Sequence, residues 1–315
     1  MKIYNHLSEF KKLDNAVVTI GTFDGVHYGH QKIVKRLCEL AHATGGESVI
    51  LTFFPHPRQI IDPENLDLKM INTIKEKAGI LDALGVDHLI ITPFTRDFSN
   101  LGPEEYIQQV LVETLGTKSI IVGYDHRFGK DRKGGMKELE SSAKLFDYSI
   151  EVIDEQDIND VAVSSTKVRQ ALLRGDVALA AKYLGYHFSL EGRVIKGDKI
   201  GRTIGFPTAN IFVEESYKLI PSDGIYAVEV LMGTERYKGM AYIGQRPTIN
   251  GMTRNIEVNI FDFNQEIYGQ DIKMFFLEFL RHDVKFTGLE ALKEQLKQDK
   301  EDTLAYFKKL SQSPD

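Results

Sequence analysis

The chain has 315 residues, of which 42% are hydrophobic and 27% charged, a composition that suits one large domain or two ordinary ones. Its formal net charge of -6 gives no electrostatic footprint for a polyanion, so the totals do not favour nucleic-acid binding. The amino-terminal residues lack the apolar core of a secretion signal, and no stretch approaches the ~18 apolar residues of a membrane span. We therefore expect a cytoplasmic protein with neither nucleic-acid nor membrane partners.

The single cysteine and several histidines have no evident chemical role. Cys38 lies on the apolar side of an expected helix and has no second cysteine with which to pair, so we interpret it as a buried, unreactive thiol. For His6, His42 and His88 we expect surface positions.

Strand-like and helix-like segments alternate up to about residue 183, which is typical of βα units around a mostly parallel sheet. Apolar residues at helical spacing predict a helix over 30–42, and a proline with two glutamates predicts a helix start at 103–115. The first half is therefore predicted to be α/β. Its expected strands are 16–20, 48–54, 88–93, 119–123 and 148–153.

The pattern changes after the short amphipathic stretch 176–184. Several short strand-like runs separated by Gly, Pro and Asn predict a small antiparallel barrel or sandwich, and 289–310 reads as a long charged helix. We place the domain boundary near residue 185, giving domains 1–184 and 185–315. The expected strands of the second domain are 188–195, 206–212, 225–231, 239–243, 255–263 and 272–280.

The segment GTFDGVHYGH, at 21–30, joins an expected buried strand to an amphipathic helix. Backbone amides and the positive helix end would face whatever sits in the turn, and an anionic phosphate suits that place. Gly21 and Gly25 allow close backbone approach, and His27 and His30 can both point at one phosphate group. Surface or capping histidines are the alternative, but the order strand, glycine turn, HxGH and helix favours a nucleotide site.

This segment resembles the HxGH signature of the nucleotidyltransferase superfamily, in the version carried by bacterial bifunctional riboflavin kinase/FAD synthetases. FFPHP at 53–57 and GYDHRFG at 123–129 also match, and both end expected strands, where ligands bind in open α/β sheets. VSSTKVR at 163–169 resembles the family's ISSTRIR, with serines that can cap a helix. The resemblance implies a Rossmann-like nucleotidyltransferase domain for residues 1–184.

The chemistry that the resemblance implies is attack of an FMN phosphate oxygen on the α-phosphorus of ATP, giving FAD and pyrophosphate without a covalent intermediate. His126 stands where the family more often has an aromatic residue, and Lys167 keeps the charge of the usual arginine without its fork. By resemblance, catalysis uses His27, His30 and Arg169. ATP is bound by Gly21, Phe23, Asp24, Gly25, His27, His30, Ser164, Ser165, Thr166 and Arg169, and the flavin by Phe54, His56 and Asp125.

The segment GRVIKGDKIGRTIGFPTAN, at 192–210, is glycine-rich and basic. A P-loop is excluded because Asp198 stands where GK[ST] is required. The segment resembles the GFPTAN signature of riboflavin kinase domains, which form a six-stranded antiparallel barrel. The resemblance implies that Thr208 and Asn210 bind Mg²⁺, for which hydroxyl and amide oxygens are suitable ligands. The implied ATP-binding residues are Gly197, Gly205, Thr208 and Asn210.

RNIEVNIFDF, at 254–263, matches the family strand that carries a catalytic carboxylate. By resemblance, Glu257 accepts the proton of the attacking ribityl hydroxyl, with a salt-bridged strand glutamate as the alternative. Arg281 and Asp283 are the implied flavin contacts of this domain. Asn259 replaces a common histidine, and Asp283 replaces a usual glutamate. GQRPT at 244–248 and PSDGIY at 221–226 also match, as turns that shape the pocket.

We therefore expect two Mg²⁺-dependent reactions: riboflavin and ATP give FMN, and FMN and ATP give FAD. We expect a monomer or weak oligomer whose partners are these small molecules. Two alternatives stay open at this point. The first domain could adenylylate or cytidylylate another small phosphate, since HxGH turns serve several acceptors. The chain could also be a flavin-binding regulator without catalysis, although it has no basic DNA-binding unit.

Overall fold

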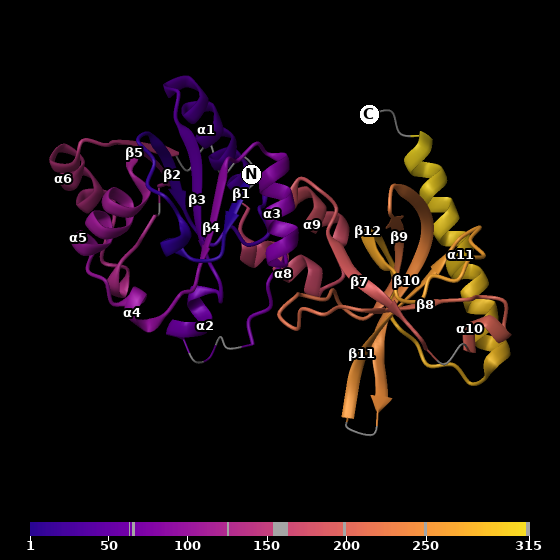
Figure 1. Ribbon diagram of the computed structural model, residues 1–315. Helices are drawn as coiled ribbons and strands as arrows, with labels where there is room; N and C mark the ends of the chain where they lie inside the picture. Colours follow the sequence, from indigo (N-terminus) through magenta and orange to yellow (C-terminus); the bar gives the residue numbers. More distant parts are fainter. Residues whose placement is uncertain are drawn as a thin grey trace. The chain divides into compact units, whose positions relative to one another are not determined.

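The computed structural model describes residues 1–62, 64, 67–124, 126–153, 163–197, 200–248 and 251–312. They form two compact units, Met1–Ser165 and Thr166–Asp315 (Figure 1). The predicted flavin contact Asp125 and the residue Asp198 lie outside the described residues. Across the described ranges, we find no helix that is long and apolar enough to cross a membrane.

The first unit is built on a parallel sheet of six strands in the order β1-β4-β3-β2-β5-β6. The chain runs outward from β2 to β3 and β4, then returns to the other side of β2 with β5, so the topological switch point lies between β2 and β5. The short edge strand β1, which pairs with β4, was not predicted from the sequence. The strands are β1 Lys2–Tyr4, β2 Ala16–Ile20, β3 Glu47–Phe53, β4 His88–Thr92, β5 Thr117–Gly123 and β6 Ser149–Ile153.

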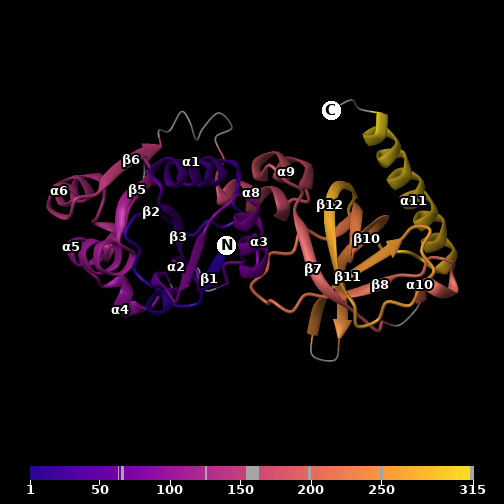
Figure 2. The ribbon, with the colours of Figure 1, turned by 45° about the horizontal axis from the view of Figure 1, so that its top comes forward.

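Helices cover both faces of this sheet. Val17 and Ile50 pack on the face that carries α1 Tyr28–Thr44 and α3 Ile74–Ala83. Their neighbours in sequence face the opposite layer, which contains η3 Tyr106–Leu115 and α6 Met136–Phe146 (Figure 2). Burial on both faces explains why the strands read as continuous apolar runs rather than alternating ones. Shorter helices of the unit are η1 Leu7–Glu9, α2 Pro57–Ile61, α4 Arg96–Ser99, α5 Pro103–Glu105 and η4 Lys130–Arg132.

The helix expected at 103–115 is confirmed, but it has two windings. It begins as α5 at Pro103 and continues as the π-helix η3 from Tyr106 to Leu115. Gly116 ends it in a left-handed conformation with φ of 72°, and a Cβ there would stand 1.9 Å from the carbonyl oxygen of Leu13. Only glycine fits that position without displacing backbone.

The second unit is a closed barrel whose strands follow the order β10-β11-β8-β7-β12-β9, each pair antiparallel. The predicted six-stranded barrel is therefore confirmed, although β10 and β11 are longer than expected. The strands are β7 Ser189–Ile195, β8 Ala209–Phe212, β9 Gly224–Met232, β10 Glu235–Thr248, β11 Gly251–Ile260 and β12 Asp271–Arg281. The helices are α8 Ser165–Leu173, α9 Val177–Leu184, α10 Ile200–Thr203 and α11 Leu289–Gln312.

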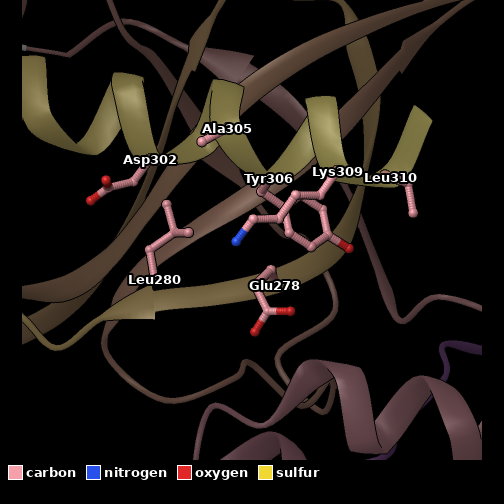
Figure 3. Close-up of a pocket in the computed structure, with 7 residues that line it drawn as sticks. All are labelled: Glu278, Leu280, Asp302, Ala305, Tyr306, Lys309 and Leu310. Atoms are coloured by element: carbon pink, nitrogen blue, oxygen red, sulfur yellow. The ribbon is translucent and has the colours of Figure 1, made fainter. Parts of the chain in front are cut away.

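Helix α11 lies along the outside of the barrel and contacts β9, β10 and β12 (Figure 1). Its anchor is Asp299, which is 1% exposed and accepts two hydrogen bonds from the Arg281 guanidinium at 2.6 and 2.7 Å. A cavity of about 550 Å³ lies between this helix and β12 (Figure 3). It is lined by Glu278, Leu280, Asp302, Ala305, Tyr306, Lys309 and Leu310, none of which is a predicted site residue.

One surface expectation is wrong. His88 is 2% exposed, because β1 and the start of β3 cover its strand. Its ring nitrogens are hydrogen-bonded to Glu47 at 2.8 Å and to the Tyr4 hydroxyl at 3.1 Å. His6 and His42 are exposed as expected. Cys38 is half-buried in α1, and burial raises the pKa of its thiol, as an unreactive cysteine requires.

Candidate active sites

The GTFDGVHYGH segment forms the turn between β2 and α1, beside the switch point of the sheet. Its backbone is unusual. Phe23 and Val26 have φ of 46° and 34°, in the left-handed region that side chains disfavour, and Gly25 between them has φ of 83°. Such conformations persist only where surrounding contacts enforce them, and they concentrate at functional sites.

The two histidines of the turn lie against each other. Their rings stack with centroids 3.7 Å apart and an interplanar angle of 15°. His27 is the N-cap of α1, and its Nδ1 accepts the backbone N–H of His30 at 3.4 Å. A neutral ring with an accepting Nδ1 carries its proton on Nε2, so His27 offers one N–H donor to a ligand.

Both imidazoles are neutral at pH 7. Burial lowers the pKa of His27 to about 4. The pKa of His30 also lies well below its usual value, first because of burial, then because of repulsion from His27 when that ring is protonated, and then because of the charge of Lys77. The Nδ1 of His30 is buried and has no hydrogen-bond partner among the described residues. Buried polar atoms are rarely left unsatisfied, so this nitrogen marks a place for a ligand group.

Asp24 ties the turn to the rest of the first unit. Its side chain is fully buried, and Oδ1 accepts the backbone N–H of Ile71 at 2.9 Å. Its backbone carbonyl accepts the hydroxyl of Ser165 at 2.9 Å. The structure thus brings Ser165 to the turn, as expected, although its hydroxyl binds Asp24 rather than an amide of its own helix. Thr166 and Arg169 belong to the second unit, and their contacts with ATP stay predictions.

The sequence reasoning missed Lys77. This lysine is wholly buried, and its Nζ donates to the Thr22 carbonyl oxygen at 2.7 Å. The signal was present in the sequence, because Ile74, Ala78 and Leu81 form the core-facing stripe of α3 and Lys77 falls within it. A lysine in such a stripe must find a polar partner in the interior.

The predicted flavin residues Phe54 and His56 follow β3, at the carboxyl edge of the sheet. Phe54 is half-buried and packs against the core on the α1 side. His56 is 7% exposed and caps α2, since its Nδ1 accepts the backbone N–H of Arg58 at 3.1 Å. One ring nitrogen of His56 is thus committed to the backbone.

A row of aromatic rings crosses the same edge of the sheet, and the sequence analysis did not assemble it. The rings come from the end of β3, from the segment after β4 including α4, from η3 and from the segment after β5, and His126 stands at one end of the row. Phe53, Tyr106 and Phe128 are buried in the core on the η3 side of the sheet, so the row packs this layer against the strands. Centroid separations are 5.3 Å for Phe53–Phe94, 5.4 Å for Phe53–Phe98, 5.8 Å for Phe98–Tyr106, 5.2 Å for Tyr106–Phe128 and 5.8 Å for Phe128–His126.

The second constellation lies on β8 and β11 of the barrel. The Thr208 hydroxyl donates to Oε2 of Glu257 at 2.7 Å, and Asn210 pairs directly with Glu257 in the strand register. Oε1 of Glu257 accepts the Asn255 side-chain amide at 2.5 Å. Both carboxylate oxygens are therefore held in place, and each retains a lone pair for a further proton.

The residues beside Glu257 fit a magnesium ion. The Thr208 hydroxyl donates its hydrogen bond to the carboxylate, so the lone pairs of its oxygen stay available to a cation. Asn210 is 9% exposed, and a Cβ built at Gly197 would stand 2.1 Å from its Nδ2. A hydroxyl, an amide and a carboxylate are hard oxygen donors, the set that Mg²⁺ prefers.

Asn259 stabilises the signature segment from the neighbouring strand. Its side-chain amide donates to the Pro207 carbonyl oxygen at 2.6 Å, next to Thr208. The departure from the family's histidine thus keeps a polar link to the segment that carries Thr208. Gly205, two residues before Pro207, has φ of 84°, a conformation that glycine adopts without strain.

The predicted flavin contacts at the end of β12 are engaged within the protein. The Arg281 guanidinium binds Asp299 through two nitrogens and the His282 carbonyl oxygen through the third, at 2.9 Å. Asp283 is exposed and accepts the Tyr242 hydroxyl at 3.0 Å. Their contacts with a flavin stay predictions.

Comparisons with known proteins match both units. The family model for FAD synthetase matches residues 9–167, and the model for riboflavin kinase matches residues 184–307. A bifunctional riboflavin kinase/FMN adenylyltransferase of Listeria monocytogenes is 40% identical over 94% of each chain, and one of Bacillus subtilis is 37% identical over 94% of this chain and 93% of its own. A crystal structure described as a macrolide-efflux protein from Streptococcus pneumoniae superposes with a TM-score of 0.87 at 33% identity, covering 96% of this chain and 98% of that one.

The first unit is a parallel α/β fold with a histidine turn at its switch point, and the second is a closed barrel with a threonine, asparagine and glutamate cluster. Together they define a two-part nucleotide-dependent transferase. The chain belongs to the family of bifunctional riboflavin kinases/FMN adenylyltransferases.

Proposed function

We propose that this protein makes both flavin coenzymes from riboflavin and ATP. The barrel phosphorylates riboflavin to FMN, and the α/β unit transfers the adenylyl group of a second ATP to FMN. The observation that carries the proposal is that each unit holds one complete constellation, the stacked histidines in the first and the Thr208–Glu257 pair in the second. Family membership supports the same two activities.

In the kinase reaction, Glu257 is the proton acceptor. The terminal hydroxyl of the ribityl chain gives its proton to the carboxylate as its oxygen attacks the γ-phosphorus of ATP, and ADP leaves. The hydrogen bonds from Thr208 and Asn255 fix the Glu257 carboxylate in one orientation, so its side chain is already in place when riboflavin binds. Gly197 and Gly205 leave the backbone open beside the ATP phosphates.

Magnesium would be held by Thr208 and Asn210 together with the ATP phosphates. When bound, the ion supplies positive charge that neutralises the transferring phosphoryl group. Thr208 then has two duties, since its proton orients Glu257 and its oxygen meets the cation.

In the adenylyl transfer, a phosphate oxygen of FMN attacks the α-phosphorus of ATP and pyrophosphate leaves. Neutral His27 and His30 donate N–H groups to the phosphates, and the α1 amino terminus adds its positive end. Arg169 holds the departing pyrophosphate, and Ser164, Ser165 and Thr166 line the nucleotide. Phe54, His56 and Asp125 receive the flavin.

The direct test is turnover by the purified protein. Riboflavin with ATP and Mg²⁺ gives FMN and then FAD, and FMN with ATP gives FAD and an equal amount of pyrophosphate, as separated by chromatography of the flavins. If FMN yields no pyrophosphate while another small phosphate does, the first unit transfers nucleotidyl groups to that other acceptor. If flavin binds without turnover, the chain is a binding protein. We further propose that the protein acts in the cytoplasm as a monomer or weak oligomer.

A further inference from the structure

We propose that Lys77 is a positioning residue for adenylyl transfer: its buried ammonium holds the Thr22 carbonyl, and thereby the strained turn 21–26, in the conformation that sets His30 against His27. This inference rests on the proposed FAD-forming function of the first unit. Lys77 lies on α3, outside each sequence motif discussed above, and its side chain is fully buried at the carboxyl edge of the sheet.

The contacts run from the lysine to the histidines in short steps. Nζ of Lys77 donates to the Thr22 carbonyl oxygen at 2.7 Å, and the Thr52 hydroxyl donates to the same oxygen at 3.2 Å. Phe23 follows directly, in a left-handed conformation, and its ring lies 5.1 Å from the ring of His30. Holding the Thr22 carbonyl therefore fixes the position of the Phe23 ring on which His30 rests.

A second link joins the same two segments in the opposite direction. The backbone N–H of Ile71, shortly before α3, donates to Oδ1 of Asp24 at 2.9 Å. Thr73 caps α3 by accepting the N–H of Glu76 at 3.1 Å, and this cap fixes the first turn of the helix that carries Lys77. The turn is thus held on both sides of Phe23, at Thr22 by a side chain and at Asp24 by a backbone amide.

Burial of the Lys77 ammonium costs free energy, because an apolar environment disfavours its charge, and polar partners must offset that cost. Burial lowers the pKa of Lys77 to about 8, with Asp24 acting in the other direction. The titratable groups that face the ammonium are Asp24 and His30 of the turn, while the neighbouring Glu76 accepts the Thr73 backbone N–H. Burial is the main reason why the pKa of His30 is low, and the positive charge of Lys77 lowers it further. The same charge adds to the positive potential that an ATP phosphate would meet at this turn.

The test compares three variants in the full-length protein. Lys77→Met keeps the length of the side chain and removes the donor, whereas Lys77→Arg keeps the charge and a donor at high pH. Lys75→Met is the matched control, since Lys75 lies two residues away on the same helix and is exposed. FMN formation by the barrel serves as the internal control in every preparation.

Lys77→Met is expected to lower kcat for FAD formation by about 10²-fold with a small change in KM for FMN, the effect of a misplaced catalytic group rather than of lost binding. FMN formation and the Lys75→Met variant stay within twofold of wild type. Folded Lys77→Met with wild-type kcat would overturn the proposal.

The pH profile separates positioning from simple support of the fold. In the wild type, kcat/KM for FAD formation falls as pH rises through about 8, because the free enzyme loses the Lys77 proton there. Lys77→Arg is expected to lose this alkaline limb, and FMN formation does not show it. If the limb remains in Lys77→Arg, the proposal is wrong, and this holds even where Lys77→Met fails to fold. A wild type that forms no FAD at all would instead contradict the proposed function.

Discussion

The stacked pair His27 and His30 consists of two neutral rings. Burial lowers the pKa of both, so in the proposed mechanism each ring meets the phosphates as an N–H donor. Among the described residues, Nδ1 of His30 has no hydrogen-bond partner, which supports the proposal that a ligand group binds there.

Replacing His30 tests its proposed role as a hydrogen-bond donor to the phosphates. His30→Ala removes one donor to the reacting phosphates, and we expect FAD formation to fall by about 10²–10³-fold. FMN formation should be unchanged, because the barrel does not use this residue. His42→Ala, an exposed histidine on the same helix, is the control. A His30→Ala protein that forms FAD at the wild-type rate would remove His30 from the mechanism.

The buried histidine pair also makes stability depend on pH. The pKa of His27 is about 4 in the folded protein against 6.5 in the unfolded chain, so the unfolded state binds more protons between these values. Stability is therefore full above pH 6.5 and is lost as pH falls toward 4, by about 3 kcal/mol from this residue.

His27→Asn keeps a helix-capping side chain and removes the titration. Calorimetric melting temperatures between pH 7 and pH 4.5 should fall less steeply in this variant than in wild type, and His42→Asn should follow wild type. An unchanged acid slope in His27→Asn would show that other groups govern the acid sensitivity.

Substitution of Thr208 tests the proposed Mg²⁺ contact in the barrel. Thr208→Ala removes a hydroxyl oxygen from the proposed Mg²⁺ site and a hydrogen bond to Glu257, contacts worth about 1.5–3 kcal/mol, or roughly 10–100-fold. We expect the Mg²⁺ concentration for half-maximal FMN formation to rise by this factor, and Thr208→Ser to stay close to wild type. Equal behaviour of the two variants would argue against a metal contact at this oxygen.

At the scale of elements, sequence patterns predicted most of the framework. Short β-branched runs that alternate with helical segments predicted the parallel strands β2, β3, β4 and β5, and six short strand-like runs predicted the barrel. Edge strand β1 was not predicted, because three residues are too few to show the alternation of a strand. The π-helix η3 was not distinguished from an α-helix, because the spacing of its apolar residues is almost the same.

Contacts between elements were harder to predict. Lys77 reaches Thr22, and Asn259 reaches Pro207, across separations of about fifty residues that no local pattern encodes. The aromatic row is similar, since its rings come from separate segments that only the fold brings together. The motifs predicted where the candidate sites lie, but the supporting contacts depend on tertiary structure.

Helix α11 is joined to the barrel by the ion pair between Asp299 and Arg281, in addition to the buried side chains of Thr303 and Phe307. Asp299→Asn leaves the Arg281 guanidinium, which is 21% exposed, without its charged partner, which costs about 3 kcal/mol. The melting temperature should fall by roughly 10 °C or more. Asp302→Asn, an exposed carboxylate one turn away, should have little effect. Equal melting temperatures for the two variants would contradict an anchoring role.

At the scale of the whole molecule, the chain carries two compact units, and each holds its own constellation. The order of motifs along the sequence predicted two domains with one constellation each, while the position of the domain boundary stays a prediction. The compact units part at Ser165, the FAD synthetase match ends at 167, and the riboflavin kinase match begins at 184. Helices α8 and α9 occupy this interval, so a boundary near residue 185 assigns both to the first domain.

The separation of the two activities is the central claim, and one crossed measurement tests it. His30→Ala and Glu257→Gln are each given riboflavin or FMN with ATP and Mg²⁺, and the flavins are separated by chromatography. We predict that His30→Ala accumulates FMN without FAD, and that Glu257→Gln converts supplied FMN to FAD while forming FMN about 10²–10⁴-fold more slowly. Loss of both activities in both variants, with each protein folded, would contradict the account.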